Sequence, residues 1–304
     1  MSLPNVLIIG SMKSGTTGIY MDLATHPDVF LAQDKEPQCL CSDQVMTDAG
    51  REEYAKLYHR AREDQVICDA STSYSKRPDY DGVPQRAVEV LPENFKVIYI
   101  VRHPIERIKS QHYHEYSAGL VSDNLYREVK QHSRYIDYSR YAYQLEPWLE
   151  AVGPERIMVV RFEDYVQQRV ETVGKVCEFL GLSPNQCQIE ADTIYNKSQD
   201  KPVLNSFWKQ VSSNTIYRTV LRPLLPPKRR LEIYKRILPK APEKPIDDST
   251  EISDWLRASL FDDVLQFYEL LGLQTPLWED MKAVDTPAPI PFPVAATSSS
   301  LESV

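Results

Sequence analysis

Short, strongly apolar runs alternate with helix-like segments along most of this chain. Four of these runs, Val6–Ile9, Val66–Cys68, Lys96–Val101 and Arg156–Arg161, are rich in β-branched residues. Uninterrupted apolar runs of this length are typical of strands that are buried on both faces of a parallel sheet. The alternation therefore predicts an α/β fold, a three-layer sandwich in which helices cover a central, mostly parallel sheet.

The segments between the runs have the spacing and the end signals of helices. Pro104 is expected to begin one helix in its first turn, where a missing N–H costs little, and Gly181 and Gly272 are expected to end two others. A shorter fifth strand is expected at Asp28–Leu31. The other expected helices are Thr16–Thr25, Glu52–Arg62, Pro84–Val90, Tyr141–Ala151, Val170–Leu180 and Thr250–Leu271.

A single domain is expected over residues 1–280. The 304 residues, 42% hydrophobic and 26% charged, are ordinary for a globular chain, and the chain is long enough to bury a large core. Residues 202–245 are rich in basic and aromatic side chains, and we expect them to form a lid or an inserted segment beside the site. Residues 281–304 are rich in Pro, Ala and Ser, which is typical of a disordered tail.

Charge and cysteine content exclude several classes of protein. With 43 acidic and 35 basic residues the net charge is −8, which argues against a dedicated nucleic-acid binder. No run approaches the ~20 apolar residues of a membrane span, and the first strand-like run follows no basic segment or cleavage site, so we expect no signal peptide. The five cysteines are an odd number without a framework spacing. We therefore expect reduced thiols and a cytoplasmic protein with neither a nucleic-acid nor a membrane partner.

The segment from Gly10 to Thr17 joins the first expected strand to the first expected helix and reads Gly-Ser-Met-Lys-Ser-Gly-Thr-Thr. A strand, a Gly/Ser loop and a helix in this order aim backbone N–H groups and the helix dipole at one point, which suits a phosphate or a sulfate. Lys13 adds a positive charge, and Thr16 adds a hydroxyl donor. The segment is not a Walker A motif, because Lys13 precedes Gly15 and does not follow it.

A second polar segment follows the strand expected at Lys96–Val101. Arg102 comes at its carboxyl end, and Ser110 lies eight residues later, two helical turns along the same helix face. An arginine in this position can form two parallel hydrogen bonds with a phosphate. Arg107 lies between them. It could pair with an acidic side chain instead of contacting the phosphate.

Together the two segments resemble the PAPS-dependent sulfotransferases, which transfer a sulfuryl group from 3′-phosphoadenosine 5′-phosphosulfate (PAPS). Their phosphosulfate loop has the form Lys-x-Gly-Thr-Thr, and their 3′-phosphate site has Arg followed by Ser eight residues later. Asp69–Tyr74, Ser139–Tyr141, Arg161–Tyr165 and a final helix followed by Trp278 are similar to the glycan-type branch of this family. The resemblance covers about residues 4–280, and it implies the P-loop NTPase-like sulfotransferase fold.

The resemblance also implies which residues bind the donor and the acceptor. The donor-binding residues would be Ser11, Lys13, Ser14, Gly15, Thr16, Thr17, Arg102, Ser110, Lys197 and Ser198. The acceptor-binding residues would be Lys35, Glu36, Ser73, Tyr74, Arg140 and Tyr141.

Sulfuryl transfer is an in-line displacement that needs no metal, in which negative charge develops on the bridging oxygen of the leaving nucleotide. The resemblance implies that Lys13 stabilises this oxygen, that Glu36 is the general base, and that His114 assists. Which of Glu36 and His114 is the principal base stays open. The Cys39-Leu40-Cys41 stretch departs from the aromatic residues that the glycan-type branch has here.

The acceptor itself is not readable from the sequence. A hydroxyl, or an amine, of a small metabolite, a natural product or a carbohydrate fits the resemblance, and the oligomeric state stays unknown. Two alternatives remain: a magnesium-dependent P-loop kinase or NTPase, and a nucleotide-binding protein without catalysis. The position of Lys13 and the Arg102/Ser110 pair argue against the first, and the presence of Lys13, Glu36 and His114 together argues against the second.

Overall fold

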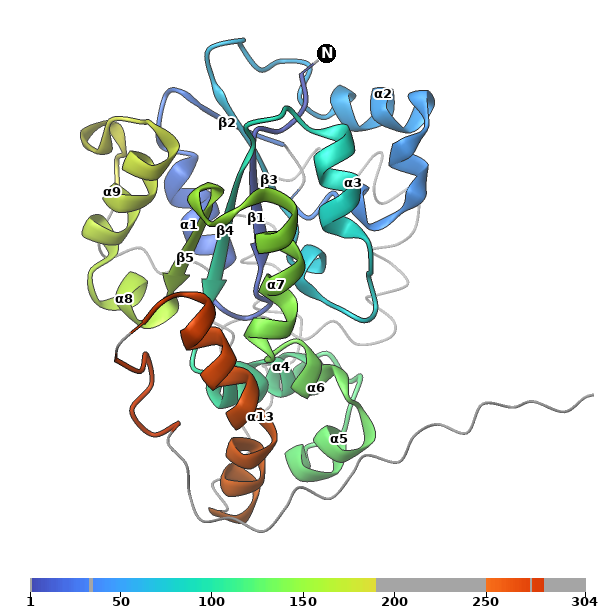
Figure 1. Ribbon diagram of the computed structural model, residues 1–304, viewed down its shortest axis with the longest axis vertical. Coiled ribbons are helices and arrows are strands. Elements are labelled where there is room, and N and C mark those ends of the chain that lie inside the picture. The colour runs from blue at the N-terminus through green and yellow to red at the C-terminus, as the bar shows by residue number, and fades with distance from the viewer. Residues whose placement is uncertain (1, 33–34, 190–249, 274, 282–304) are drawn as a thin grey trace, which may run out of the picture.

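The computed structural model describes residues 2–32, 35–189, 250–273 and 275–281. Within these residues five strands form one sheet in the order β2-β3-β1-β4-β5, and all neighbours are parallel (Figure 1). The strands are β1 (Val6–Gly10), β2 (Val29–Leu31), β3 (Val66–Ala70), β4 (Lys96–Val101) and β5 (Ile157–Arg161). The expected α/β fold with a parallel central sheet is confirmed.

Helices cover both faces of the sheet. Successive side chains of a strand point to opposite faces, so an uninterrupted apolar strand has two apolar faces to bury. Leu7 and Ile9 pack into one core cluster, and Val6 and Ile8 pack into the other. The second cluster includes α1 (Thr16–Leu23), α8 (Phe162–Gln167) and α9 (Arg169–Leu180). The first includes α2 (Asp48–Lys56), α3 (Val83–Val90) and α7 (Tyr141–Val152).

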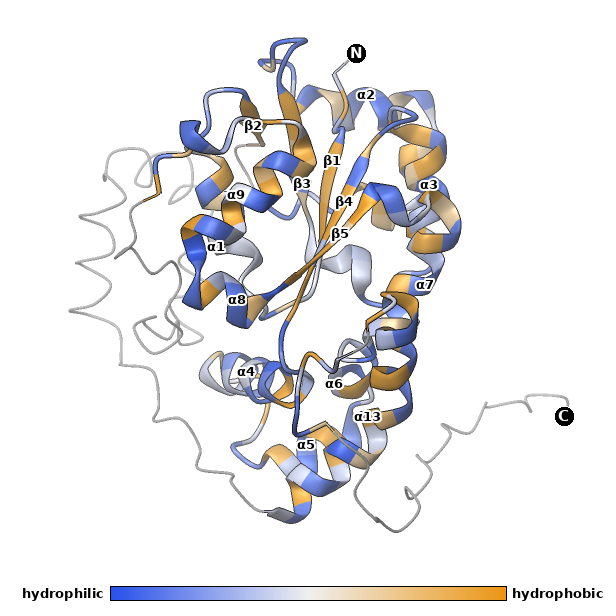
Figure 2. Ribbon diagram, turned by 60° about the vertical axis from the view of Figure 1, so that its left-hand side comes forward, coloured by the Kyte–Doolittle hydropathy of each residue, from blue (hydrophilic) through white to orange (hydrophobic). Residues whose placement is uncertain are grey.

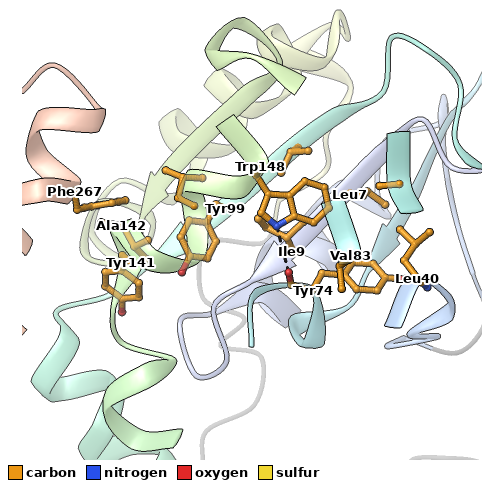
Figure 3. Packing of buried hydrophobic residues seen from close by; sticks show 14 of the residues in the cluster. Leu7, Ile9, Leu40, Tyr74, Val83, Tyr99, Tyr141, Ala142, Trp148 and Phe267 are labelled. Carbon is orange, nitrogen blue, oxygen red and sulfur yellow. Dashed lines mark hydrogen bonds between the residues drawn. The ribbon is translucent and has the colours of Figure 1, made fainter. Parts of the chain in front are cut away.

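The first cluster is rich in aromatic side chains. Figure 3 shows Trp148 of α7 between the sheet and Tyr74, and its indole Nε1 donates to the Tyr74 carbonyl at 3.2 Å. Tyr99 of β4 and Tyr141 at the start of α7 pack edge to face, with ring centroids 5.9 Å apart. The sheet strands are mostly apolar in Figure 2, as is typical of buried parallel strands.

Further helices lie beyond the carboxyl ends of β4 and β5 (Figure 1). They are α4 (Pro104–Ser117), α5 (Leu125–Gln131), α6 (Arg134–Asp137) and α13 (Thr250–Leu270), and α13 packs against α7 and α4. Short 3-10 turns lie at Cys39–Cys41, Asp43–Met46, Thr72–Ser75, Pro154–Arg156 and Pro184–Gln186. None of the helices in the described ranges combines the length and the hydropathy of a membrane-spanning segment.

The structure differs from the expected elements in a few places. The helix expected at Glu52–Arg62 begins earlier, at Asp48, because the Thr47 hydroxyl caps it by accepting from the Gly50 N–H at 3.1 Å. Met281, at the start of the expected tail, is buried in the core. The expected segment at 202–245, the candidate residues Lys197 and Ser198, and the rest of the tail lie outside the described residues.

Candidate functional site

The carboxyl ends of β1 and β4 meet at the centre of the sheet. The chain passes from β1 to β2 and β3 on one side, and then crosses to β4 and β5 on the other side. In open parallel sheets such a reversal leaves a crevice at the carboxyl ends of the two strands, where ligands bind. The loops after β1 and β4 are therefore the place to look for a site.

The loop after β1 is fastened to β4. The backbone N–H of Ser11 donates to the Ile100 carbonyl at 2.6 Å, and its hydroxyl contacts the same carbonyl at 3.0 Å. The hydroxyl oxygens of Ser11 and Ser14 lie 2.5 Å apart, and both residues are fully buried. Their hydroxyls therefore shape the loop from inside, which does not fit the expected direct contact with a phosphosulfate.

Gly15 makes the transition from this loop into α1. Its φ of 84° is in the left-handed region, and a Cβ at this position would lie 2.7 Å from the Phe162 ring. Helix α1 begins at the next residue, so its first N–H groups, including those of Thr16 and Thr17, have no carbonyl one turn earlier in the helix. The loop therefore presents backbone donors and the positive end of a helix dipole, as an anion site requires.

Arg102 follows β4 and leans against the same loop. Its Nη1 lies 3.5 Å from the Lys13 carbonyl oxygen, and its guanidinium lies over the Phe162 ring at 5.0 Å. Its Nη2 is 3.8 Å from Glu106. Ser110 is two turns further along α4 and is partly exposed. The two expected anion anchors are therefore in direct contact through the Lys13 carbonyl.

Tyr141 contacts the backbone of Arg102. Its hydroxyl donates to the Arg102 carbonyl at 2.6 Å, and the side chain is fully buried. It packs in the core, so the expectation that it contacts an acceptor does not fit. Arg140 is more exposed, and its Nε is 3.8 Å from Asp263.

Glu36 lies beside the start of α1, on a turn whose residues 35 and 36 follow β2. One carboxylate oxygen is 2.6 Å from the Lys35 ammonium, which is also 3.4 Å from the Thr16 hydroxyl. The other accepts from the backbone N–H and the hydroxyl of Thr72, at 2.7 and 3.0 Å. The candidate base is therefore held close to the expected donor loop and ion-paired to the expected acceptor lysine.

A buried carboxylate orders the turn under Glu36. Asp69 accepts from the hydroxyls of Tyr54 at 2.6 Å, Tyr74 at 2.7 Å and Ser71 at 2.9 Å, and the Ser71 hydroxyl accepts from the Gln38 N–H at 3.1 Å. Burial raises the pKa of Asp69 to about 6. This network was not expected from the sequence, although an acid at the end of a buried strand was a signal for it.

Two residues expected to contact the acceptor, Ser73 and Tyr74, are buried in the turn that Asp69 orders. Tyr74 is buried with its hydroxyl on Asp69, and Ser73 is 1% exposed. Neither surface is available to an acceptor, so both support the turn in place of contacting a ligand. His114 is partly exposed and lies one helical turn after Ser110 on α4, which puts the two on one face.

Lys76 was missed by the sequence reasoning. It follows the Thr72–Ser75 turn, and its ammonium lies 5.8 Å from the centre of the Tyr138 ring. Burial lowers its pKa, which the nearby Glu36 and Cys41 partly offset. Its one sequence signal was a lysine two residues after the turn tyrosine, and its position beside Glu36 makes it a candidate acceptor contact.

The Cys39 and Cys41 thiols lie near the same region. Burial raises the pKa of each to about 12, so both are protonated at neutral pH. They therefore offer the site small, weakly polar surfaces and no reactive thiolate. No group of three potential metal ligands occurs in the part of the chain that the structure describes.

The sheet is parallel, a Lys/Gly/Thr loop leads into a helix start, and an arginine from the neighbouring strand lies against that loop. This arrangement is typical of proteins that bind nucleotides or phosphates. The comparisons with known proteins narrow this class. The family model described as "Sulfotransferase domain" matches residues 3–219. The chain therefore belongs to the sulfotransferase family.

Individual relatives are distant. Human carbohydrate sulfotransferase 15 is 24% identical over 248 residues, which cover 60% of this chain and 44% of the relative. Human heparan sulfate glucosamine 3-O-sulfotransferase 3B1 is 25% identical over 219 residues, covering 66% of this chain and 52% of the relative. The chain thus spans about half the length of the curated relatives it matches.

Among solved structures, a sulfotransferase from Alicyclobacillus acidocaldarius has the same fold. Its TM-score is 0.60 at 20% identity, and the match covers 90% of this chain and 98% of the other. The expected P-loop NTPase-like sulfotransferase fold is confirmed.

Proposed function

We propose that this chain transfers a sulfuryl group from PAPS to a hydroxyl, or an amine, of a carbohydrate or another small acceptor. Family membership supports the reaction class. One observation carries the choice of donor: Arg102 lies 3.5 Å from the carbonyl of Lys13, so the two anion anchors are in contact. PAPS carries a 3′-phosphate and a 5′-phosphosulfate, and two neighbouring anchors suit two anionic groups on one nucleotide.

The residues present fit this donor. Two basic residues, Lys13 and Arg102, lie in the two contacting loops beside the start of α1, and Thr17 is partly exposed at the helix start. Bound PAPS would supply the sulfuryl group and leave as adenosine 3′,5′-bisphosphate. Ser11 and Ser14 are left out of the donor contacts because their hydroxyls are buried in the loop.

The protein positions the donor and the acceptor and stabilises the charge that develops during the reaction. Lys13 stabilises negative charge on the leaving oxygen. Glu36 accepts the proton of the acceptor hydroxyl, and the Lys35 ammonium at 2.6 Å holds its carboxylate in place. His114 assists from the Ser110 face of α4.

A carbohydrate is the acceptor class that we favour. The printed names of the human relatives describe sulfation of carbohydrates and of heparan sulfate glucosamine, and Lys35, Lys76 and Arg140 are polar or basic groups near Glu36 or the start of α7. The cytoplasmic location stays a prediction that rests on the reduced state expected for the five cysteines. Cell fractionation with an antibody against the chain tests it.

Thermal unfolding with added nucleotides tests the donor. Adenosine 3′,5′-bisphosphate without magnesium should raise the Tm, because a ligand that binds only the folded state stabilises it, and ATP should raise it little. Arg102→Ala should lose most of this shift, whereas Arg156→Ala, at the opposite end of β5, should keep it. Equal stabilisation by ATP would count against a PAPS site. Transfer of labelled sulfate from PAPS to carbohydrate acceptors then tests the reaction.

A further inference from the structure

Arg107 lies in α4 and is fully buried. Its Nε donates to the Ser139 hydroxyl at 2.6 Å, Nη1 to the Gln111 amide oxygen at 2.8 Å, and Nη2 to the Tyr135 carbonyl at 2.8 Å. Nη1 also lies 3.5 Å from the Met12 carbonyl oxygen in the loop after β1. The guanidinium therefore joins α4 and α6 to the expected donor loop.

All of these partners are neutral. Within the described residues no carboxylate lies within ion-pair distance of Arg107, in contrast to the acidic partner that the sequence left open. The acid in this network is Glu115, which accepts from the Gln111 amide and does not contact the arginine itself. Glu115 is itself paired with Arg134 at 2.8 Å and with the Tyr135 hydroxyl at 2.6 Å.

A buried cation without a contacting anion is unfavourable, and burial lowers the pKa of Arg107 accordingly. A bound anion near Arg107 would offset the unfavourable burial of its charge. Among the described residues, the one polar group that Arg107 reaches outside α4 and the α6 region is the Met12 carbonyl, in the loop after β1. The missing negative charge would then lie on the other side of that loop.

Two successive carbonyls of this loop are held by two arginines. Met12 is held by Arg107 and Lys13 by Arg102, each at 3.5 Å. In a trans peptide the C=O and the N–H point in opposite directions. Turning the Met12 carbonyl toward Arg107 therefore turns the Lys13 N–H away from it, toward the opposite side of the loop.

We propose that Arg107 is a positioning residue for donor binding: it fixes the Met12 peptide so that the loop presents its N–H groups to an anion, and its buried charge is balanced by the anionic donor. This proposal rests on the proposed function, because PAPS or its bisphosphate product is the anion. The donor itself need not touch Arg107.

The test compares Arg107→Lys and Arg107→Gln with the wild type. Adenosine 3′,5′-bisphosphate affinity is measured by calorimetry, the KM for PAPS and for the acceptor by kinetics, and the Tm without ligand by calorimetric unfolding. We expect Arg107→Gln to weaken bisphosphate binding about tenfold or more and to raise the KM for PAPS, with the KM for the acceptor unchanged. Arg107→Lys, which keeps the charge, should recover part of the affinity.

Arg169→Gln is the matched control. Arg169 is also largely buried, but it pairs directly with the buried Asp22, at 2.5 Å. Its loss should lower the Tm and leave the bisphosphate affinity of the folded protein unchanged, which is what a purely structural arginine does.

The outcomes separate the two proposals. If the wild type does not bind the bisphosphate, the proposed function fails. If the wild type binds it and Arg107→Gln binds equally well, the role of Arg107 is overturned while the function stands. Should both arginine variants fail to fold, Ser139→Ala removes the bond to Nε, together with the contacts of the Ser139 hydroxyl with the Tyr135 and Pro104 carbonyls. It should weaken bisphosphate binding about threefold, and unchanged binding would overturn the proposal.

Discussion

Lys13 and Glu36 share an uncommon backbone conformation. Their φ angles are 72° and 66°, in the left-handed region that side chains other than glycine rarely adopt. Each such residue costs about 1–3 kcal/mol, and these conformations concentrate at functional sites. At the scale of single residues, the two candidate catalytic side chains are therefore held where the backbone would not place them by preference.

Replacing Lys13 by Gly and by Ala separates its conformation from its charge. Both variants should lower kcat about a hundredfold, because each removes the group that we propose to stabilise the leaving oxygen. Lys13→Gly should be more stable than Lys13→Ala by about 1 kcal/mol, because glycine adopts a positive φ without strain. Urea unfolding and single-turnover transfer measure the two effects. Wild-type turnover in either variant would remove Lys13 from the mechanism.

Asp69 predicts a pH dependence of stability. Its pKa is raised from 3.8 to about 6 in the folded protein, so between these values the folded state holds a proton that the unfolded chain has lost. Stability from this group is thus fully present below pH 3.8 and is lost as the pH rises to about 6, by about 3 kcal/mol.

Asp69→Asn stays neutral and should escape this loss. The stability of the variant relative to the wild type should therefore rise as the pH increases from about 4 to about 7, measured by urea unfolding at each pH. The control is Asp123→Asn, the same substitution at an exposed position, which should give no such trend. A difference that does not change with pH would show that Asp69 is ionised throughout.

At the scale of elements, the strands were predictable and several helices were not. The run Lys96–Val101 is β-branched and apolar, and it forms β4 over the same residues. Helices α5, α6 and α8 were missed because they are short, seven, four and six residues, and tertiary contacts decide such short helices more than intrinsic preference does.

Helix α7 is capped by a residue from another helix, which no local pattern could predict. Asp263 of α13 accepts from the N–H groups of Ala142 and Tyr143, at 3.1 and 3.0 Å. These are orphan donors at the start of α7, and a carboxylate there also interacts favourably with the helix dipole.

Asp263→Ala should lower stability by about 1–2 kcal/mol, because it leaves these donors buried without an acceptor. Denaturant unfolding measures this loss. Asp262→Ala, on the exposed face of the same helix, should have little effect. Equal effects of the two substitutions would mean that α7 does not depend on this cap.

At the scale of the whole molecule, residues far apart in the sequence support the proposed donor site. Trp278 packs on Tyr141 and on His103, with ring centroids 5.9 and 6.0 Å apart, and Tyr141 in turn supports Arg102. The sequence predicted the two anchor segments, because each is a local motif. It could not predict that Tyr141 faces the core or that Arg107 reaches Met12, since both depend on how distant helices pack.

The adjacency of β1 and β4 gives the protein a fixed molecular gauge. Backbone hydrogen bonds join the two strands, so the separation of the Lys13 turn and Arg102 is set by the spacing of a sheet and changes little when loops move. For the proposed donor site, we therefore expect a nucleotide to be selected first by how far apart its two negative groups stand. Nucleotides that carry only one such group, or carry both at the same end, should bind weakly, whichever base they bear.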